Sequence, residues 1–112
     1  MKLPNANQAA VTREKIADYL LNPVHPDNGG KADFFTQLGF HRKCWKVLAA
    51  ALTKLAVESE VARASESRHG NKYVIVGRMQ TPGGKSPLVQ TIWIVSRGEQ
   101  KETAVLAKGD NP

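Results

Sequence analysis

The spacing of apolar residues changes near residue 58, and this change limits the possible folds more than any other feature of the sequence. Before it, apolar side chains recur every three or four residues, which is the period of an α-helix. After it, they alternate or form short runs bounded by Gly, Pro and Ser, as in β-strands. A chain of 112 residues with 41% hydrophobic content suits one domain with one core. We therefore expect a single α+β domain over residues 1–112, with helices first and strands after them.

About three helices are expected in the first half. Thr12 is suited to cap a helix over residues 12–21, which ends before Pro23 because the residue preceding proline avoids the helical region. A short helix follows over residues 31–38, and Gly39 is suited to end it. An apolar stripe at helical spacing defines the third helix, and its members are Cys44, Val47, Leu48, Ala51, Leu52 and Leu55. Cys44 is therefore expected in the core and not as a nucleophile.

Four strands are expected in the second half, and they read as an antiparallel meander. The segments are VARASESR (61–68), KYVIVGRM (72–79), LVQTIWIV (88–95) and ETAVLA (102–107). The segment TPGGK (81–85) between the second and third of these predicts a hairpin turn, because its glycines accept positive φ angles. The predicted architecture is a four-stranded antiparallel sheet with the helices packed on one face.

The strand over residues 88–95 has two largely apolar faces. One face holds Val89, Thr91, Trp93 and Val95, and the other holds Leu88, Gln90, Ile92 and Ile94. We assign Ile92 and Ile94 to the helix side, which leaves Thr91 and Trp93 on an open face. The opposite assignment stays available because both faces are mostly apolar.

Composition narrows the function classes. Sixteen Lys and Arg against ten Asp and Glu give a net charge of +6, which favours anionic partners such as RNA, DNA or an acidic protein. The alternative is a charge that only keeps the protein soluble. No apolar run approaches the roughly 18 residues of a membrane span, and the N-terminus lacks a signal peptide's apolar segment. We expect a cytoplasmic protein of bacterial type, or a domain of a larger protein, without a membrane partner.

Several kinds of chemistry are excluded by missing motifs. A single cysteine rules out an internal disulfide and a cysteine-based zinc cage. The sequence holds no G-x-S-x-G elbow, dinucleotide fingerprint or paired-carboxylate pattern. The three histidines share no metal-ligand spacing, so neither a metal nor another cofactor is expected.

The segment LNPVHPDNGGKADFF (21–35) places a proline-flanked histidine close to two glycines and a lysine. It is not a P-loop, because His25 and Ala32 occupy positions where that motif needs Gly and Ser or Thr. Flexible backbone N–H groups and Lys31 could still hold one anion. The alternative is an ordinary turn with Lys31 in solvent. An imidazole such as that of His25 can accept or give a proton, although a loop histidine can equally be a polar surface residue.

The family resemblance is carried by KLPNA at the start, KIADYLLNPVHPDNGGKADFFTQLGF in the middle and KYVIVG…TPGGK…VQTIWIV near the end. These segments resemble a small bacterial domain of uncharacterised function, which occurs alone beside a small partner gene and at the C-termini of large polymorphic toxins. The order of elements also resembles the barnase–EndoU–colicin–RelE nuclease fold. In this resemblance His25, Lys31, Tyr73, Thr91 and Trp93 match family positions. The chain departs from it at its end, AKGDNP, where similar domains often carry an apolar and aromatic tail.

The resemblance implies a metal-independent ribonuclease of the toxin kind, with RNA as substrate and an acidic antitoxin or immunity protein as partner. RNA cleavage by the 2′-hydroxyl needs a base, a cation on the phosphate and an acid for the leaving 5′-oxygen. We assign His25 as base or acid, Lys31 as phosphate clamp and Thr91 as a phosphate hydrogen-bond donor. Substrate binding is assigned to Lys72, Arg78, His69 and Trp93.

Two other functions fit the same sequence. A non-catalytic module that binds RNA or an acidic protein shares the basic charge and needs no histidine. A structural or phage-associated component would form a stable homo-oligomer without affinity for nucleic acid. The sequence pattern defines no oligomeric state.

Overall fold

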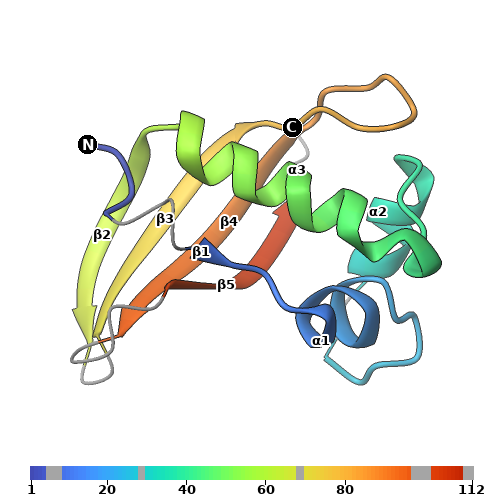
Figure 1. Cartoon of the computed structure of the whole chain (residues 1–112), viewed down its shortest axis with the longest axis horizontal. Coiled ribbons are helices and arrows are strands. Elements are labelled where there is room, and N and C mark those ends of the chain that lie inside the picture. The colour runs from blue at the N-terminus through green and yellow to red at the C-terminus, as the bar shows by residue number, and fades with distance from the viewer. Residues whose placement is uncertain (5–8, 28–29, 68–69, 97–101, 110–112) are drawn as a thin grey trace.

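The sheet is built almost entirely from the second half of the chain (Figure 1). The computed structural model describes residues 1–4, 9–27, 30–67, 70–96 and 102–109. The strands are β1 (Ala9–Ala10), β2 (Val61–Ser67), β3 (Gly70–Arg78), β4 (Leu88–Ser96) and β5 (Glu102–Gly109). Their order across the sheet is β1-β5-β4-β3-β2, with the last four antiparallel to their neighbours and β1 parallel to β5.

The predicted four-stranded antiparallel sheet is therefore not confirmed, because β1 adds a short parallel strand at one edge. Two alanines carry no strand pattern of their own, so only pairing with the distant β5 defines this element. The three strands β2, β3 and β4 agree with the predicted segments to within two residues at each end.

Three helical regions precede the sheet, as predicted, and the fold is α+β. The helices are α1 (Arg13–Lys15), η2 (Ile16–Leu20), α2 (Lys31–Gln37), η3 (Arg42–Cys44) and α3 (Trp45–Glu58). The Lys15 N–H donates to Thr12 Oγ1 at 3.3 Å, so Thr12 caps the first region as expected. That region changes at Ile16 from α-helical to π-helical winding. None of the helices in the described ranges is long and apolar enough to cross a membrane.

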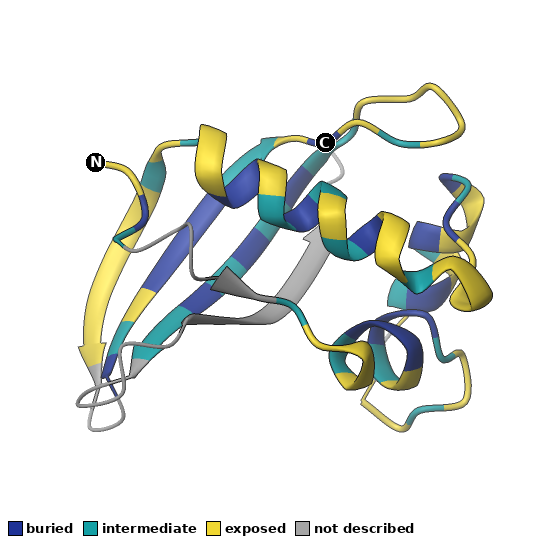
Figure 2. Ribbon diagram, in the orientation of Figure 1, coloured by how far each residue is buried: buried dark blue, intermediate teal, exposed yellow. Residues whose placement is uncertain are grey.

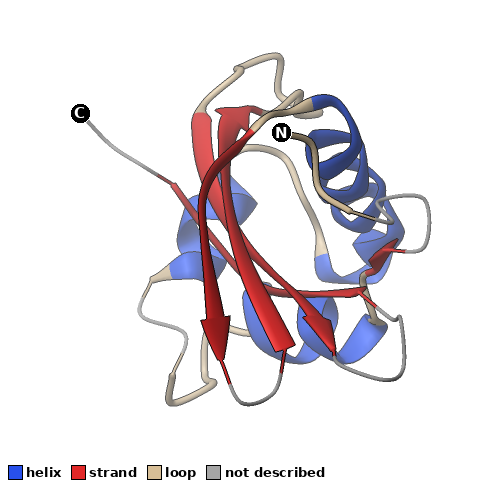
Figure 3. Cartoon of the chain, turned by 90° about the vertical axis from the view of Figure 1, so that its left-hand side faces the viewer, coloured by secondary structure: helices blue, strands red, loops and turns tan. Residues whose placement is uncertain are grey.

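Helix α3 covers one face of the sheet, and Figure 3 shows it on one side of the strands. Its buried residues are Leu48, Leu52, Leu55 and Ala56 (Figure 2). The predicted stripe is wrong at its start, because Cys44 is exposed and Val47 is 48% exposed. Cys44 lies in the tighter 3₁₀ turn η3, whose winding moves it off the α-helical stripe.

The sheet face under the helices is the one that carries Trp93, so the predicted assignment of the two faces is wrong. Thr91 and Trp93 are 1% and 0% exposed, whereas Ile92 and Ile94 on the other face are half-buried. The indole N–H of Trp93 donates to Thr91 Oγ1 at 2.7 Å, and Thr91 Oγ1 lies 3.3 Å from the Ile75 carbonyl, to which it donates. A large indole with a satisfied N–H is well suited to a core.

The remaining core residues close the space between sheet and helices. They include Phe35 and Phe40 from the helical half, which join Leu48 and Leu52, and Tyr73, Ile75 and Val89 from the strands. Helix α3 approaches β3 closely at Gly77, where an added Cβ would lie 2.8 Å from both Leu55 Cδ1 and Ser59 Oγ. A side chain at this position would therefore require the Leu55 and Ser59 side chains to move.

The hairpin loop between β3 and β4 packs against the end of α2. The Gly83 N–H donates to the Leu38 carbonyl at 3.0 Å, and Gly39 has a φ of +102°. A Cβ at Gly39 would lie 3.0 Å from the Gly83 nitrogen, so the predicted helix end and the predicted turn meet here. This contact fixes the loop over the helical end of the molecule.

Candidate functional site

His25 and Lys31 meet at the ring of Tyr19. The His25 imidazole stands edge-on to this ring, with centroids 5.0 Å apart and an interplanar angle of 74°. The Lys31 ammonium lies 5.8 Å from the centroid of the same ring. We call these three residues the Tyr19 cluster; all three are half-buried.

The loop between η2 and α2 holds His25 in one orientation. The His25 N–H donates to the Asn22 carbonyl at 3.2 Å, and the Asp27 N–H donates to His25 Nδ1 at 3.1 Å. The Tyr19 hydroxyl donates to the Asp27 carbonyl at 3.3 Å, which ties the ring to the loop. Because Nδ1 accepts a hydrogen bond, the neutral imidazole carries its proton on Nε2.

Lys31 is the first residue of α2 and follows Gly30, whose φ is +88°. A left-handed residue at this point turns the chain from the loop into the helix without steric cost for glycine. The helix then starts with the Phe34 N–H donating to the Gly30 carbonyl at 3.1 Å. The turn brings the Lys31 side chain back over Tyr19.

Thr91 and Trp93 do not belong to this cluster. The Thr91 hydroxyl accepts from one core group and donates to another, and its residue is 1% exposed. The expected contact of Thr91 with a phosphate is therefore wrong, since the hydroxyl is buried and already paired. Trp93 is completely buried and has no face available for a nucleotide base.

Lys72 and Arg78 are an even number of positions apart on β3, so they lie on the same face of the sheet. Both are exposed, and this face is turned away from α3. Arg78 Nη1 donates to the Ser86 carbonyl at 3.1 Å. In Figure 1 the start of β3 lies at the left-hand end of the long axis, whereas residues 21–27 lie at the right-hand end. Lys72 is therefore separated from the Tyr19 cluster. His69 lies outside the described residues.

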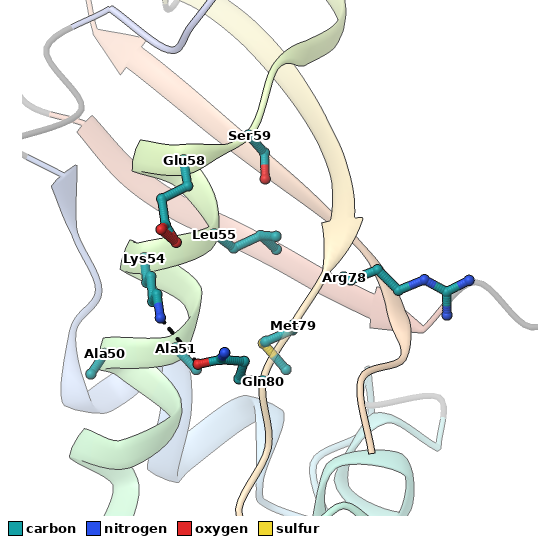
Figure 4. Close-up of a pocket in the computed structure, with 9 residues that line it drawn as sticks. All are labelled: Ala50, Ala51, Lys54, Leu55, Glu58, Ser59, Arg78, Met79 and Gln80. Carbon is teal, nitrogen blue, oxygen red and sulfur yellow. Dashed lines mark hydrogen bonds between the residues drawn. The ribbon is translucent and has the colours of Figure 1, made fainter. Parts of the chain in front are cut away.

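A hollow of about 410 Å³ opens between α3 and the end of β3 (Figure 4). Leu55, Met79 and Ala51 supply its apolar part, and Lys54 Nζ donates to Gln80 Oε1 at 3.0 Å across it. Arg78 is the one predicted site residue that lines it, and Figure 4 shows its guanidinium pointing away. This hollow therefore holds no charged group from the predicted site.

Tyr19 is absent from the predicted site, because an aromatic residue at helical spacing beside Ile16 and Leu20 equally fits the core side of a helix. Its half-buried ring with a hydroxyl is typical of a residue at the boundary of a core. In the described ranges, no three His, Cys, Asp or Glu side chains gather as a possible metal site.

Comparison with solved structures shows a protein with a similar fold. The chain is similar to one chain of a solved contact-dependent growth inhibition toxin–immunity protein complex from Klebsiella pneumoniae 342. The TM-score is 0.71 at 13% identity, with 89% of this chain and 98% of that chain covered. At this identity the likeness is one of fold. No curated protein matches the sequence. A family model does match, over residues 2–107, and the chain belongs to that family, Domain of unknown function (DUF6883).

Proposed function

We propose that the chain is a toxin-type ribonuclease domain that acts at the Tyr19 cluster. The observation that carries the proposal is the meeting of an imidazole and an ammonium group at one aromatic ring. A proton-exchanging group beside a fixed cation is the minimum that metal-independent phosphodiester cleavage requires. The shared fold with a chain of a toxin–immunity complex supports the toxin part of the proposal.

The proposed reaction uses the RNA 2′-hydroxyl as its nucleophile. The 2′-oxygen forms a bond to the adjacent phosphorus, the bond from phosphorus to the 5′-oxygen breaks, and a 2′,3′-cyclic phosphate and a 5′-hydroxyl result. The 2′-hydroxyl loses a proton and the 5′-oxygen gains one. His25 exchanges one of these protons and solvent water exchanges the other, while Lys31 neutralises the charge that develops on the phosphate oxygens.

The hydrogen bond from Asp27 limits how His25 can act. With Nδ1 occupied, the neutral ring offers Nε2–H as a donor, and taking up a proton requires the Asp27 bond to break. His25 therefore acts either as an acid–base group that releases Asp27 during the reaction or as a donor to a phosphate oxygen. These two roles predict different behaviour for a His25→Gln variant, which keeps a donor but cannot exchange a proton.

The test is cleavage of total RNA, with and without EDTA, by the wild type and by His25→Ala, His25→Gln and Lys31→Ala. We expect each alanine variant to lose about 10²-fold or more in rate, the lower range for general acid–base catalysis. An exposed lysine of the hairpin loop, Lys85→Ala, is the matched control for lost charge and should stay near the wild-type rate.

Several outcomes would contradict the proposal. Equal rates in the wild type and all variants would remove the roles of His25 and Lys31. No cleavage by folded wild type would remove the enzyme, and products without cyclic phosphate ends would remove the 2′-hydroxyl mechanism. Near wild-type activity of His25→Gln would assign His25 as a hydrogen-bond donor only.

An acidic immunity protein is the partner that this function implies. The net charge of +6 favours an acidic surface opposite, and charge complementarity raises the association rate of such pairs. The partner's presence should restore growth of a host that expresses the chain.

A non-catalytic binding module is the second candidate, and the Asp27–His25 bond favours it. This bond gives His25 a purely structural task of holding the loop. Expression separates the two functions: a nuclease slows its host and the His25 and Lys31 variants relieve the effect, whereas a binding module is harmless in every form.

A further inference from the structure

The sheet face turned away from α3, here called the open face, is basic. Arg63 on β2 and Lys72 and Arg78 on β3 share this face according to the strand register, and all three are exposed. Among the described side chains of β2, β3 and β4 that lie on this face, none is acidic. The face therefore presents positive charge that its own strands do not neutralise.

Arg63 and Lys72 flank a shallow hollow of about 220 Å³ between β2 and β3. Ser65 stands directly opposite Lys72 in the register, and Arg63 stands opposite Val74. Within the described part of the chain, the side chains of Arg63 and Lys72 make no hydrogen bond or ion pair; only their backbones are paired in the sheet. Like charges on neighbouring strands repel one another. An oxyanion bound between them would remove this repulsion and would accept hydrogen bonds from both cations and from the Ser65 hydroxyl.

The chemistry of the open face favours a nucleic-acid backbone over its bases. The aromatic residues of β3 and β4, Tyr73 and Trp93, lie on the buried face, so no ring from these strands is available for stacking. The apolar residues of the open face are buried or half-buried: Val74 is 7% exposed, and Val76, Leu88, Ile92 and Ile94 are half-buried. The exposed groups that a ligand meets on the described part of this face are the guanidinium, ammonium and hydroxyl groups of Arg63, Arg78, Lys72 and Ser65. Such groups recognise phosphates without reading sequence.

We propose that the open face binds the phosphate backbone of single-stranded RNA. The hollow between Arg63 and Lys72 holds one phosphate, and Arg78 contacts another phosphate farther along β3. At about 3.3 Å per residue, the six-residue step from Lys72 to Arg78 spans roughly 20 Å, which is long enough for several nucleotides. The inference rests on the proposed function only for the choice of RNA as ligand, because the open face lies apart from the Tyr19 cluster.

The test measures binding of a short labelled oligouridylate over a range of salt concentrations. The protein carries His25→Ala so that the probe is not cut, and the test variant adds Arg63→Gln and Lys72→Gln. Each phosphate contact on a single strand contributes roughly 0.7 to the slope of log K against log salt. Because Arg63 and Lys72 share one phosphate, we expect the slope to become shallower by roughly 0.7, with weaker binding at low salt.

The matched control adds Lys43→Gln and Lys85→Gln, two exposed lysines outside the sheet, to the same His25→Ala protein. It lowers the net charge by the same amount and should keep the slope of the parent. An equal loss in the control would show that only overall charge matters and would overturn the site. An unchanged slope in the test variant would also overturn the site. An acidic protein would then remain as the candidate ligand of the open face.

Failure of this inference is distinguishable from failure of the proposed function. RNA cleavage by the wild type, combined with an unchanged slope in the test variant, removes the open-face site and keeps the nuclease. A shallower slope in the test variant, combined with an inert wild type, keeps the site and makes the chain a binding module.

Discussion

The two faces of the strands β3 and β4 share a backbone but differ in almost every other respect. The face under the helices carries the indole of Trp93 at 0% exposure, together with the paired hydroxyl of Thr91. The open face carries exposed Lys72 and Arg78. Residues one position apart therefore lie in opposite environments: close packing on one side and solvent on the other.

This comparison separates residues that hold the fold from residues available to a ligand. The family resemblance predicts that Thr91 contacts a phosphate, yet its contacts are with Trp93 and Ile75. A polar residue that the sequence suggests as a site residue can thus serve core packing. Arg63 on β2, which no motif pointed to, lies with Lys72 at the rim of a hollow.

The largest effect should come from removing the ring on the buried face. Trp93→Ala should lower the free energy of unfolding by about 3–5 kcal/mol, because it deletes a fully buried indole and leaves a cavity. Urea unfolding followed by circular dichroism measures the change. A loss below about 1 kcal/mol would show that Trp93 is not packed as described and would break the contrast between the faces.

The next largest effect should come from the hydroxyl beside it. Thr91→Val keeps the shape but leaves the Trp93 indole N–H without its acceptor, which should cost about 1–3 kcal/mol of unfolding free energy. Thr91→Ser keeps the hydroxyl and should cost less.

RNA cleavage decides whether Thr91 has any role beyond packing. Purified, folded Thr91→Val should cleave RNA at the wild-type rate, measured well below its unfolding temperature. A loss of rate as large as that of Lys31→Ala would return Thr91 to the site and contradict the assignment of the faces.

Whether a structural feature can be predicted from the sequence depends on how close in the chain the residues that form it are. The helices and long strands follow from periods that a window of 10 to 18 residues reveals, and these elements lie where the apolar spacing put them. The meeting of His25 and Lys31 is similarly local, since only a short proline- and glycine-containing loop separates them. The strand β1 is not local, because its two residues pair with β5 at the other end of the chain.

The wrong prediction of which face of β4 packs against the helices has a different cause. Period-two alternation divides a strand into two sets but does not say which set faces the helices, and both sets of β4 are largely apolar. The large side chain of Trp93 and the Thr91 hydroxyl two residues before it indicate which face of β4 packs against the helices. A Thr and a Trp at this spacing share a face, so the hydroxyl can accept the indole hydrogen bond that burial requires.

The smallest expected effect gives the most direct comparison of the two faces, because the same change from Ile to Val is made on each face. Ile75 is completely buried under the helices, and Ile92 is half-buried on the open face. Ile75→Val should cost about 0.5–1.5 kcal/mol of unfolding free energy, and Ile92→Val should cost clearly less because its methylene is partly solvated already. Side-chain entropy and strand propensity are nearly the same in the two variants, so their difference reports burial alone. Equal costs, or a larger cost at Ile92, would mean that the open face is covered in solution, for example by a second copy of the chain; a concentration-dependent midpoint of unfolding would then accompany the result.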